Sequence, residues 1–452
     1  MTRTINRRLR ALRSPVSGEL FRTVLANCSA RVLAIVGLTL ATVVVARVGG
    51  PAAVGEYALL RMLPGMVAVL CVVGLPGALA YFLAAPRRNV PRLWPTLIAI
   101  GFIGALLGTL VWTAAAPLLA KVFFPHESPV MIALAGLTVP TQLLLTLGKT
   151  ALQGLEDRRG ADVVIAAEEL AFLPCYVLPL LAGMHGVAAI VLGLALADVV
   201  VAVEAWRRVS RRLGWTRLGL AGGDRGWWGR PDPAVGRRVA SYGLRGQVGG
   251  LMTLLNLRLD FAILGAMAGP AVLGSYAVAS KYAELLRLPG TAITWVCYPR
   301  LAKLSETEAA RSARRMIRPT LIGIAVAAIP VALLTSPVMR LLYGAEFGPA
   351  VDPARVLLAG MLLAGASGVA SAYLYGRGSP GLNSIVLGIG LVITVVLDVL
   401  LIPRYGALGA ATASTAAYLC TDGMLVGLLL RLSGRPQLRH NTAPVQGTGV
   451  AS

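Results

Sequence analysis

The sequence predicts an all-α polytopic membrane protein with about 12 transmembrane helices in two six-helix lobes related by a parallel repeat. Hydrophobic residues make up 56% of the 452 residues and charged residues only 14%, whereas soluble domains are about half apolar and a quarter charged. A second observation gives the repeat: GGPAAVGEYAL begins at residue 49 and AGPAVLGSYAV begins at residue 268. Duplicated halves are typical of secondary transporters, whose cargo site lies between the halves.

The N-terminal six-helix lobe is predicted to occupy residues 1–206. An α-helix needs about 18 to 20 apolar residues to cross the hydrocarbon, and it satisfies its own backbone hydrogen bonds, which lipid cannot do. After a basic N-terminal tail, apolar runs predict helices at 21–47, 53–83, 93–120, 128–152, 161–183 and 186–206.

The C-terminal six-helix lobe, residues 241–432, is predicted to repeat this arrangement, and a cytoplasmic tail follows at 433–452. Its helices are expected at 241–267, 271–299, 317–341, 353–376, 381–402 and 406–431. Pro and Gly interrupt the second helix of each lobe, at Pro64, Gly74 and Pro76 and at Pro289 and Gly290. Such interruptions permit bending and expose backbone groups to a wet site.

Loop charge predicts the orientation. Thirty of the 42 Lys and Arg residues lie in loops and tails on one side, and five lie on the other. Because short cytoplasmic loops collect Lys and Arg, the basic side, which carries both termini, is predicted to be cytoplasmic. The outer loops are very short, which argues against an outer catalytic domain.

Residues 207–240 are predicted to form a basic cytoplasmic linker between the lobes. Two interpretations remain open: a solvated connection, or a surface helix that holds anionic headgroups with Trp215, Trp227 and Trp228 at the interface. The net charge of +22 is spread over many loops rather than gathered on one soluble patch. We therefore expect no nucleic-acid partner.

Cysteines and histidines carry no signature of catalysis or metal binding. The five cysteines all fall in apolar segments and never pair at metal-ligand spacing, and the three histidines are scattered. Neither a metal site nor a pair of nucleophile and base can be assembled from them. The sequence predicts no cofactor, no metal and no enzyme.

Seven basic residues lie inside predicted spans, where a charge costs several kcal/mol and therefore usually faces a partner or a wet cavity. Lys149 and Arg245 lie near span ends and can snorkel to the interface. The other five lie on the first two helices of each lobe and can converge on one cavity. We predict that this cationic, substrate-binding cavity contains Arg31, Arg61, Arg258, Lys281 and Arg287.

Acidic residues decide how much of this positive charge remains. The expected ion partners in the cavity are Glu56, Asp260 and Glu284. Lys281 and Glu284 are three apart on one helical face and can pair locally. A purely structural ion network is the alternative, but the excess of positive charge favours an anionic cargo, because Arg binds phosphate through paired hydrogen bonds.

Five further acids lie inside predicted spans. They are candidates for coupling transport to proton or cation movement, although a satisfied hydrogen bond within or between helices is the alternative for each: Glu168, Glu169, Asp198, Asp398 and Asp422.

Several segments resemble bacterial oligosaccharide flippases, the polysaccharide-exporter branch of the multidrug, oligosaccharidyl-lipid and polysaccharide exporter superfamily. The resemblance rests on Asp260 in the seventh helix, Gly274 and Tyr276 opening the eighth, and Pro299 and Arg300 leaving the membrane. Gly55 and Tyr57, with the segments LQGLEDRRGAD and IPRYGALGAATAS, extend it over nearly the whole chain.

This resemblance implies a flippase in the bacterial cytoplasmic (inner) membrane that moves an undecaprenyl-pyrophosphate-linked oligosaccharide to the outer leaflet by alternating access, for cell-surface polysaccharide such as exopolysaccharide. Its partners would be the lipid-linked glycan, the bilayer, and a polysaccharide polymerase or glycosyltransferases. The alternative in the same superfamily is a cation-coupled multidrug exporter, for which an acidic cavity is expected. A membrane scaffold that docks synthesis enzymes on the central linker is a third alternative.

Overall fold

The computed structural model describes residues 15–72, 74–84, 90–213, 230–290, 293, 297, 301, 304–377 and 380–432, with the backbone alone for 15–28, 90–92, 245–254, 256, 257 and 380. Every described element is a helix, as the sequence predicts. Eight described ranges are long and apolar enough to span a membrane. The protein is a multi-pass membrane protein, and its total of twelve crossings stays a prediction.

In the described part of the first half, eight helical elements follow the predicted apolar runs. They are α2 (Pro15–Cys71), α3 (Leu75–Leu83), α4 (Val90–Phe123), α5 (Pro129–Leu134), η2 (Ala135–Leu137), α6 (Thr138–Gly154), α7 (Arg158–Leu181) and α8 (Gly186–Leu213).

The second half repeats this pattern, including a short 3-10 turn within its fourth predicted span. Its elements are α9 (Pro233–Ala268), α10 (Pro270–Glu284), α12 (Glu306–Leu342), η3 (Ala345–Ala350), α13 (Val351–Gly360), η4 (Met361–Leu363), α14 (Ala364–Gly376) and α15 (Pro380–Leu432).

Several helices extend beyond their predicted ends, and three of them bear on the loops and the linker. Helix α12 begins at Glu306 rather than at 317, because Ser305 and Glu308 form a capping box that starts the helix there. Helix α8 continues to Leu213, and α9 begins at Pro233 after the N-cap Asp232. The ends of the predicted linker are therefore helical, while Trp215, Trp227 and Trp228 lie outside the described residues.

Two long helices each contain two consecutive predicted spans that are joined by a single glycine instead of a loop. Helix α2 breaks at Gly50, where φ is 68°, and α15 breaks at Gly406, where φ is 53°. Positive φ is strained for residues with a Cβ, so glycine suits both joints. They lie where the sequence predicts the boundaries between spans 1 and 2 and between spans 11 and 12.

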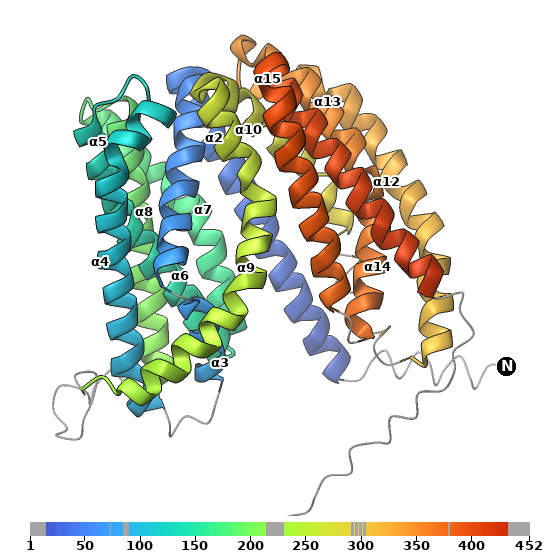
Figure 1. The fold of residues 1–452 in the computed structure, drawn as a ribbon, viewed down its shortest axis with the longest axis horizontal. Coiled ribbons are helices and arrows are strands. Elements are labelled where there is room, and N and C mark those ends of the chain that lie inside the picture. Colours follow the sequence, from blue (N-terminus) through green and yellow to red (C-terminus); the bar gives the residue numbers. More distant parts are fainter. Residues whose placement is uncertain are drawn as a thin grey trace, which may run out of the picture.

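The repeated motif lies where the two halves meet, on the side of the molecule where α10 begins (Figure 1). A Cβ on Gly55 would collide with the carbonyl oxygen of Pro270, and a Cβ on Gly274 would collide with that of Pro51. The two backbones thus touch at equivalent points of the two repeats. We call this pair of contacts the glycine contact.

A side-chain tie joins the halves on the same side. Arg47 of α2 donates from Nε to the carbonyl oxygen of Leu342 at 2.9 Å and from Nη2 to that of Leu341. These carbonyls end α12, where intrahelical donors run out. Away from this side, the helices of the two halves splay apart toward the end where α3 lies (Figure 1).

Helix α9 spans both halves. Its first turns pack on the first half: Tyr242 stacks on Tyr81 with ring centroids 4.3 Å apart, and the Asp232 amide donates to Thr96 Oγ1 at 2.9 Å. A Cβ on Gly74, which has a φ of 73°, would collide with the backbone of Gly243. The remainder of α9 packs on α15. A lobe boundary at 241 stays a prediction.

Candidate functional site

A cavity of about 140 Å³ lies between the two halves, and we call it the interface cavity. Side chains from α2, α7, α9 and α10 line it, including three of the predicted cations and one acid: Arg61, Arg258, Lys281 and Glu169. Positive charges from both repeats therefore converge on one space, as the sequence predicts. Such convergence inside a membrane protein concentrates the field on a bound anion.

Arg61 is held from two sides within the first half. Its Nη2 forms an ion pair with Glu169 of α7, and its Nη1 donates to Tyr57 Oη at 2.9 Å. Tyr57 lies one turn before Arg61 on α2, and its ring contacts Phe172 at a centroid distance of 4.7 Å. The pair is only partly exposed, at 28% for the Arg61 side chain and 15% for Glu169.

The two cations of the second half are held differently. The Arg258 guanidinium lies 5.7 Å from the centre of the Phe261 ring, and no described carboxylate forms an ion pair with it. Lys281 Nζ lies 3.4 Å from Glu284 Oε2, the local pair that their spacing predicts. Arg258 is thus the cavity cation whose charge the described carboxylates neutralise least.

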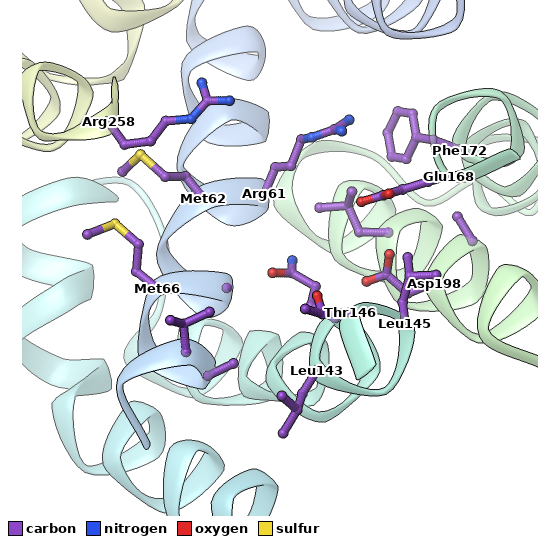
Figure 2. Close-up of a pocket in the computed structure, with 16 residues that line it drawn as sticks. Arg61, Met62, Met66, Leu143, Leu145, Thr146, Glu168, Phe172, Asp198 and Arg258 are labelled. Carbon is purple, nitrogen blue, oxygen red and sulfur yellow. The ribbon is translucent and has the colours of Figure 1, made fainter. Parts of the chain in front are cut away.

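A larger cavity of about 240 Å³ continues into the first half, and we call it the first-lobe cavity. Arg61 and Arg258 line both cavities. Figure 2 shows Arg258 at the upper left, Arg61 in the centre with its guanidinium directed toward Phe172, and the Glu168 and Asp198 carboxylates pointing inward from the right. The first-lobe cavity therefore has a basic side at the junction of the halves and an acidic side within the first half.

The acidic side is partly neutralised. Glu168 Oε2 accepts from Lys149 Nζ at 2.7 Å, and Asp198 accepts from Thr141 Oγ1 at 3.2 Å. From its place near the end of α6, Lys149 was expected to extend toward the membrane interface. It instead forms an ion pair with Glu168 of α7. The acidic side thus carries one ion pair and one carboxylate bound by a hydroxyl.

A separate polar cluster is buried in the second half. The Asp260 carboxylate accepts from Tyr276 Oη at 2.7 Å and from the Phe261 amide at 2.9 Å, and Tyr276 Oη lies 3.1 Å from Ser414 Oγ. Asp398 is fully buried, and neither carboxylate oxygen has a hydrogen-bond partner among the described residues. Asp260 is therefore bound by a tyrosine and not by Arg258.

Arg31 and Glu56, two further predicted site residues, lie outside both cavities. Arg31 is exposed on α2, seven residues before Leu38, which lines the interface cavity. A spacing of seven keeps one helical face, so Arg31 lies about 10 Å farther along that face. Glu56 interacts electrostatically with Glu127, and the ion-pair partner of Arg61 is Glu169 instead.

Arg287 and Asp422 are brought together elsewhere in the second half. Arg287 is half-buried and interacts electrostatically with Asp422 of α15. Neither residue lines the interface cavity or the first-lobe cavity. Within the described residues, no three His, Cys, Asp or Glu side chains come together as a metal site.

Sequence reasoning missed the uncharged residues that shape the site. Tyr57 was visible as part of the repeat, and its spacing of four from Arg61 puts both on one helical face. Gln142, which lines the first-lobe cavity, gave no signal in the sequence. The Phe261 ring under Arg258 is three residues along α9, a spacing that also shares a face.

Comparisons with known proteins confirm the resemblance. The family described as "Polysaccharide biosynthesis protein" matches residues 44–352. The probable flippase AglR of Haloferax volcanii is 26% identical over 198 residues, which are 42% of this chain and 40% of that protein. The chain thus matches less than half the length of this relative.

Solved structures share the fold. The lipid II flippase MurJ in an inward closed conformation has a TM-score of 0.70 at 13% identity, covering 91% of this chain and 90% of that one. An inward-facing multidrug resistance MATE family transporter of the MOP superfamily has a TM-score of 0.65 at 13% identity, covering 90% and 94%. With the family match over more than half of its length, the chain belongs to the polysaccharide biosynthesis protein family.

Proposed function

We propose that this protein is a flippase for an undecaprenyl-pyrophosphate-linked oligosaccharide, moving it from the inner to the outer leaflet of the bacterial cytoplasmic membrane for cell-surface polysaccharide synthesis. The observation that supports this most directly is the interface cavity, where Arg61, Arg258 and Lys281 come from both halves. Pyrophosphate oxygens accept the paired hydrogen bonds that guanidinium groups donate.

The division of the cavity lining fits an amphiphilic cargo. The basic side at the junction of the halves would hold the pyrophosphate, and the larger first-lobe cavity offers hydroxyl, amide and carboxylate groups for sugar hydroxyls: Thr146, Gln142, Glu168 and Asp198. The lipid chain would remain in the bilayer. The geometry thus separates the charged group of the cargo from its sugars.

Alternating access requires one side to close while the other opens. The glycine contact and the Arg47 tie hold the halves together on one side, which the loop charges predict to be the outer side. Cargo would therefore enter from the predicted cytoplasmic side, where the halves splay apart. Both termini would lie on that side.

The decisive test is the charge of Arg258. Changing Arg258→Ala should lower export at equal protein level by about tenfold or more, because a hydrogen bond to a charged group contributes about 1.5–3 kcal/mol. Arg258→Lys should restore part of the loss. The control is Arg340→Ala, which removes an exposed charge outside both cavities; normal export in Arg258→Ala would reject the proposal.

The cargo can be identified by an experiment that does not assume its structure in advance. Mass spectrometry of lipid-linked intermediates in a deletion strain and its parent should show accumulation of an undecaprenyl pyrophosphate oligosaccharide. An unchanged lipid pool, with no redundant flippase present, would favour the second candidate.

The second candidate is a cation-coupled multidrug exporter. The acidic side of the first-lobe cavity, with Glu168 and Asp198, is the observation that favours it, because cationic drugs need such groups. Lys149 neutralises Glu168, however, and two arginines line the same space. Overexpression that leaves sensitivity to cationic dyes and drugs unchanged would remove this candidate.

A further inference from the structure

We infer that Glu169 is a built-in counter-anion that competes with the phosphate groups of the cargo for Arg61, so that cargo binding exchanges one anion for another. The inference rests on the proposed function and adds a regulatory role for one residue of the site. It starts from the ion pair between Arg61 and Glu169, which lies on the lining of the interface cavity.

The position of the pair makes competition unavoidable. Arg61 lines both cavities, while Arg258 and Lys281 face it from the second half across the interface cavity, and all three cations interact electrostatically. An anion placed between the halves therefore lies beside the guanidinium that Glu169 already binds. Arg61 can donate to that anion fully only when Glu169 gives up its place.

The ion pair is incomplete, which makes it exchangeable. Glu169 Oε1 receives the Arg61 hydrogen bond, but Oε2 is buried and has no hydrogen-bond partner among the described residues. A buried acceptor without a donor is unfavourable, so the carboxylate does not gain the full benefit of its position. A pyrophosphate group, with several oxygens, can satisfy Arg61 and Arg258 together.

Tyr57 keeps Arg61 in place during the exchange. Its hydroxyl accepts from Nη1, whereas Glu169 binds Nη2, so loss of Glu169 leaves one anchor on the same guanidinium. The Tyr57 ring is in turn packed against Phe172, one turn from Glu169 on α7. The cation is therefore presented to the cavity whether or not Glu169 holds it.

For transport, the consequence is that the cargo binds with limited affinity. A carrier must bind cargo well enough to load it and weakly enough to release it. When cargo departs, Glu169 returns to Arg61 and restores the neutral pair. Without this carboxylate, three cations would hold the pyrophosphate with fewer competitors, and release would become slow.

The neighbouring carboxylate provides a matched comparison. Glu168 precedes Glu169 on α7 and carries the same charge, but its ion-pair partner is Lys149 of α6. Glu168→Gln therefore removes the same charge while leaving the pair of Arg61 and Glu169 intact. Glu204, paired with Arg208 four residues later on α8 outside both cavities, is the neutral control.

The test measures the Kd of inorganic pyrophosphate for the purified full-length protein in nanodiscs, together with export in cells. Glu169→Gln should lower this Kd by about tenfold or more and reduce export at equal protein level. Glu168→Gln should change the Kd by a smaller factor than Glu169→Gln does, and Glu204→Gln should leave both quantities unchanged. In Arg61→Gln/Glu169→Gln, the gain in affinity should disappear, because the competed cation is gone.

The outcomes separate this inference from the proposed function. If Glu169→Gln folds and binds pyrophosphate no tighter than the unchanged protein, while Arg258→Ala still weakens binding, the counter-anion role is overturned and the flippase proposal stands. If the unchanged protein binds no pyrophosphate and Arg258→Ala exports normally, both are overturned. A gain in affinity that persists in the double variant also overturns the role, because it would not depend on Arg61.

Discussion

The two tyrosines of the repeated motif occupy equivalent positions and serve opposite charges. Tyr57 Oη accepts from the Arg61 guanidinium beside the interface cavity, while Tyr276 Oη donates to the buried Asp260 carboxylate. Tyr57 is 219 residues before Tyr276, and the glycines two residues earlier make the glycine contact. The two halves thus have equivalent backbone positions at this point but differ in the charge of the group that the tyrosine hydroxyl binds.

The difference also divides the work between the halves. In the first half the polar groups beside the motif face a cavity, whereas in the second half they are enclosed with Ser414. A hydroxyl can serve both, because it donates and accepts. Tyrosine therefore suits both copies, whereas a residue that only donates or only accepts hydrogen bonds would suit one of them.

The largest effect is expected where the halves are alike. Gly55→Ala and Gly274→Ala should each destabilise the closed arrangement by about 3 kcal/mol or more, because a Cβ would lie 1.8 to 1.9 Å from a backbone carbonyl oxygen that cannot move aside. Both should lower export by a similar factor, which a cell-based export assay and thermal unfolding in detergent can measure.

Glycines of the last span supply the control for that prediction. A Cβ on Gly423 or Gly427 would meet nothing within 4 Å, so Gly423→Ala and Gly427→Ala should leave export and the unfolding temperature nearly unchanged. If Gly55→Ala and Gly274→Ala differ strongly from each other, the symmetry of the contact is not functional.

A smaller effect is expected where the halves differ. Tyr276→Phe should destabilise the protein by about 1–3 kcal/mol, because Asp260 is 5% exposed and would lose a donor in a buried site. Tyr57→Phe should cost less than about 1 kcal/mol, because Arg61 retains Glu169. Unfolding temperatures of the two variants in the same detergent test this, and equal shifts would contradict it.

The smallest effect concerns a loop that again differs in polarity between the halves. Asp157 caps α7 and accepts from Arg212 at 2.9 and 3.0 Å, whereas at the corresponding loop of the second half Arg377 donates to the carbonyls of Leu301 and Leu304 at 2.9 Å. Because the Arg212 side chain is 53% exposed, Arg212→Gln should cost less than about 1 kcal/mol.

The pH dependence of that loss has a defined sign. The Arg212 guanidinium and the Gly160 amide hold the pKa of Asp157 below its usual value. A lowered pKa stabilises the fold above the unfolded value of about 3.9 and loses this effect as the pH falls through the folded value. The difference in unfolding temperature between Arg212→Gln and the unchanged protein should stay constant from about pH 5 to 8 and shrink below about pH 4; a constant difference down to about pH 3 would contradict this.

Much of the fold could be predicted because the composition of each span reflects whether lipid or protein surrounds it. Apolar runs mark what lipid covers, and the recurrence of Gly55 and Tyr57 as Gly274 and Tyr276 reveals the duplication without any contact information. Helix ends were less accessible: α12 starts at a capping box outside the apolar run. Caps depend on backbone hydrogen bonds rather than hydrophobicity.

The candidate site could be predicted only in part. Charge and depth suggested Arg61, Arg258 and Lys281, which the structure brings to one cavity. The pairing of Arg61 with Glu169, 108 residues away, depends on how α2 and α7 are rotated about their axes. Along its own helix, Arg61 has only Glu56 within loose reach, because one sequence shows neighbours along a helix but not across helices.

The glycine contact has a consequence for the history of the chain. After a duplication, most positions of the two copies can change independently, because each contacts only its own half. Gly55 and Gly274 press on backbone belonging to the other copy, and no substitution elsewhere can shorten a carbonyl group to make room. A side chain at either position would therefore require the halves to move apart. This constraint explains why the repeat can still be recognised in the sequence at these two glycines.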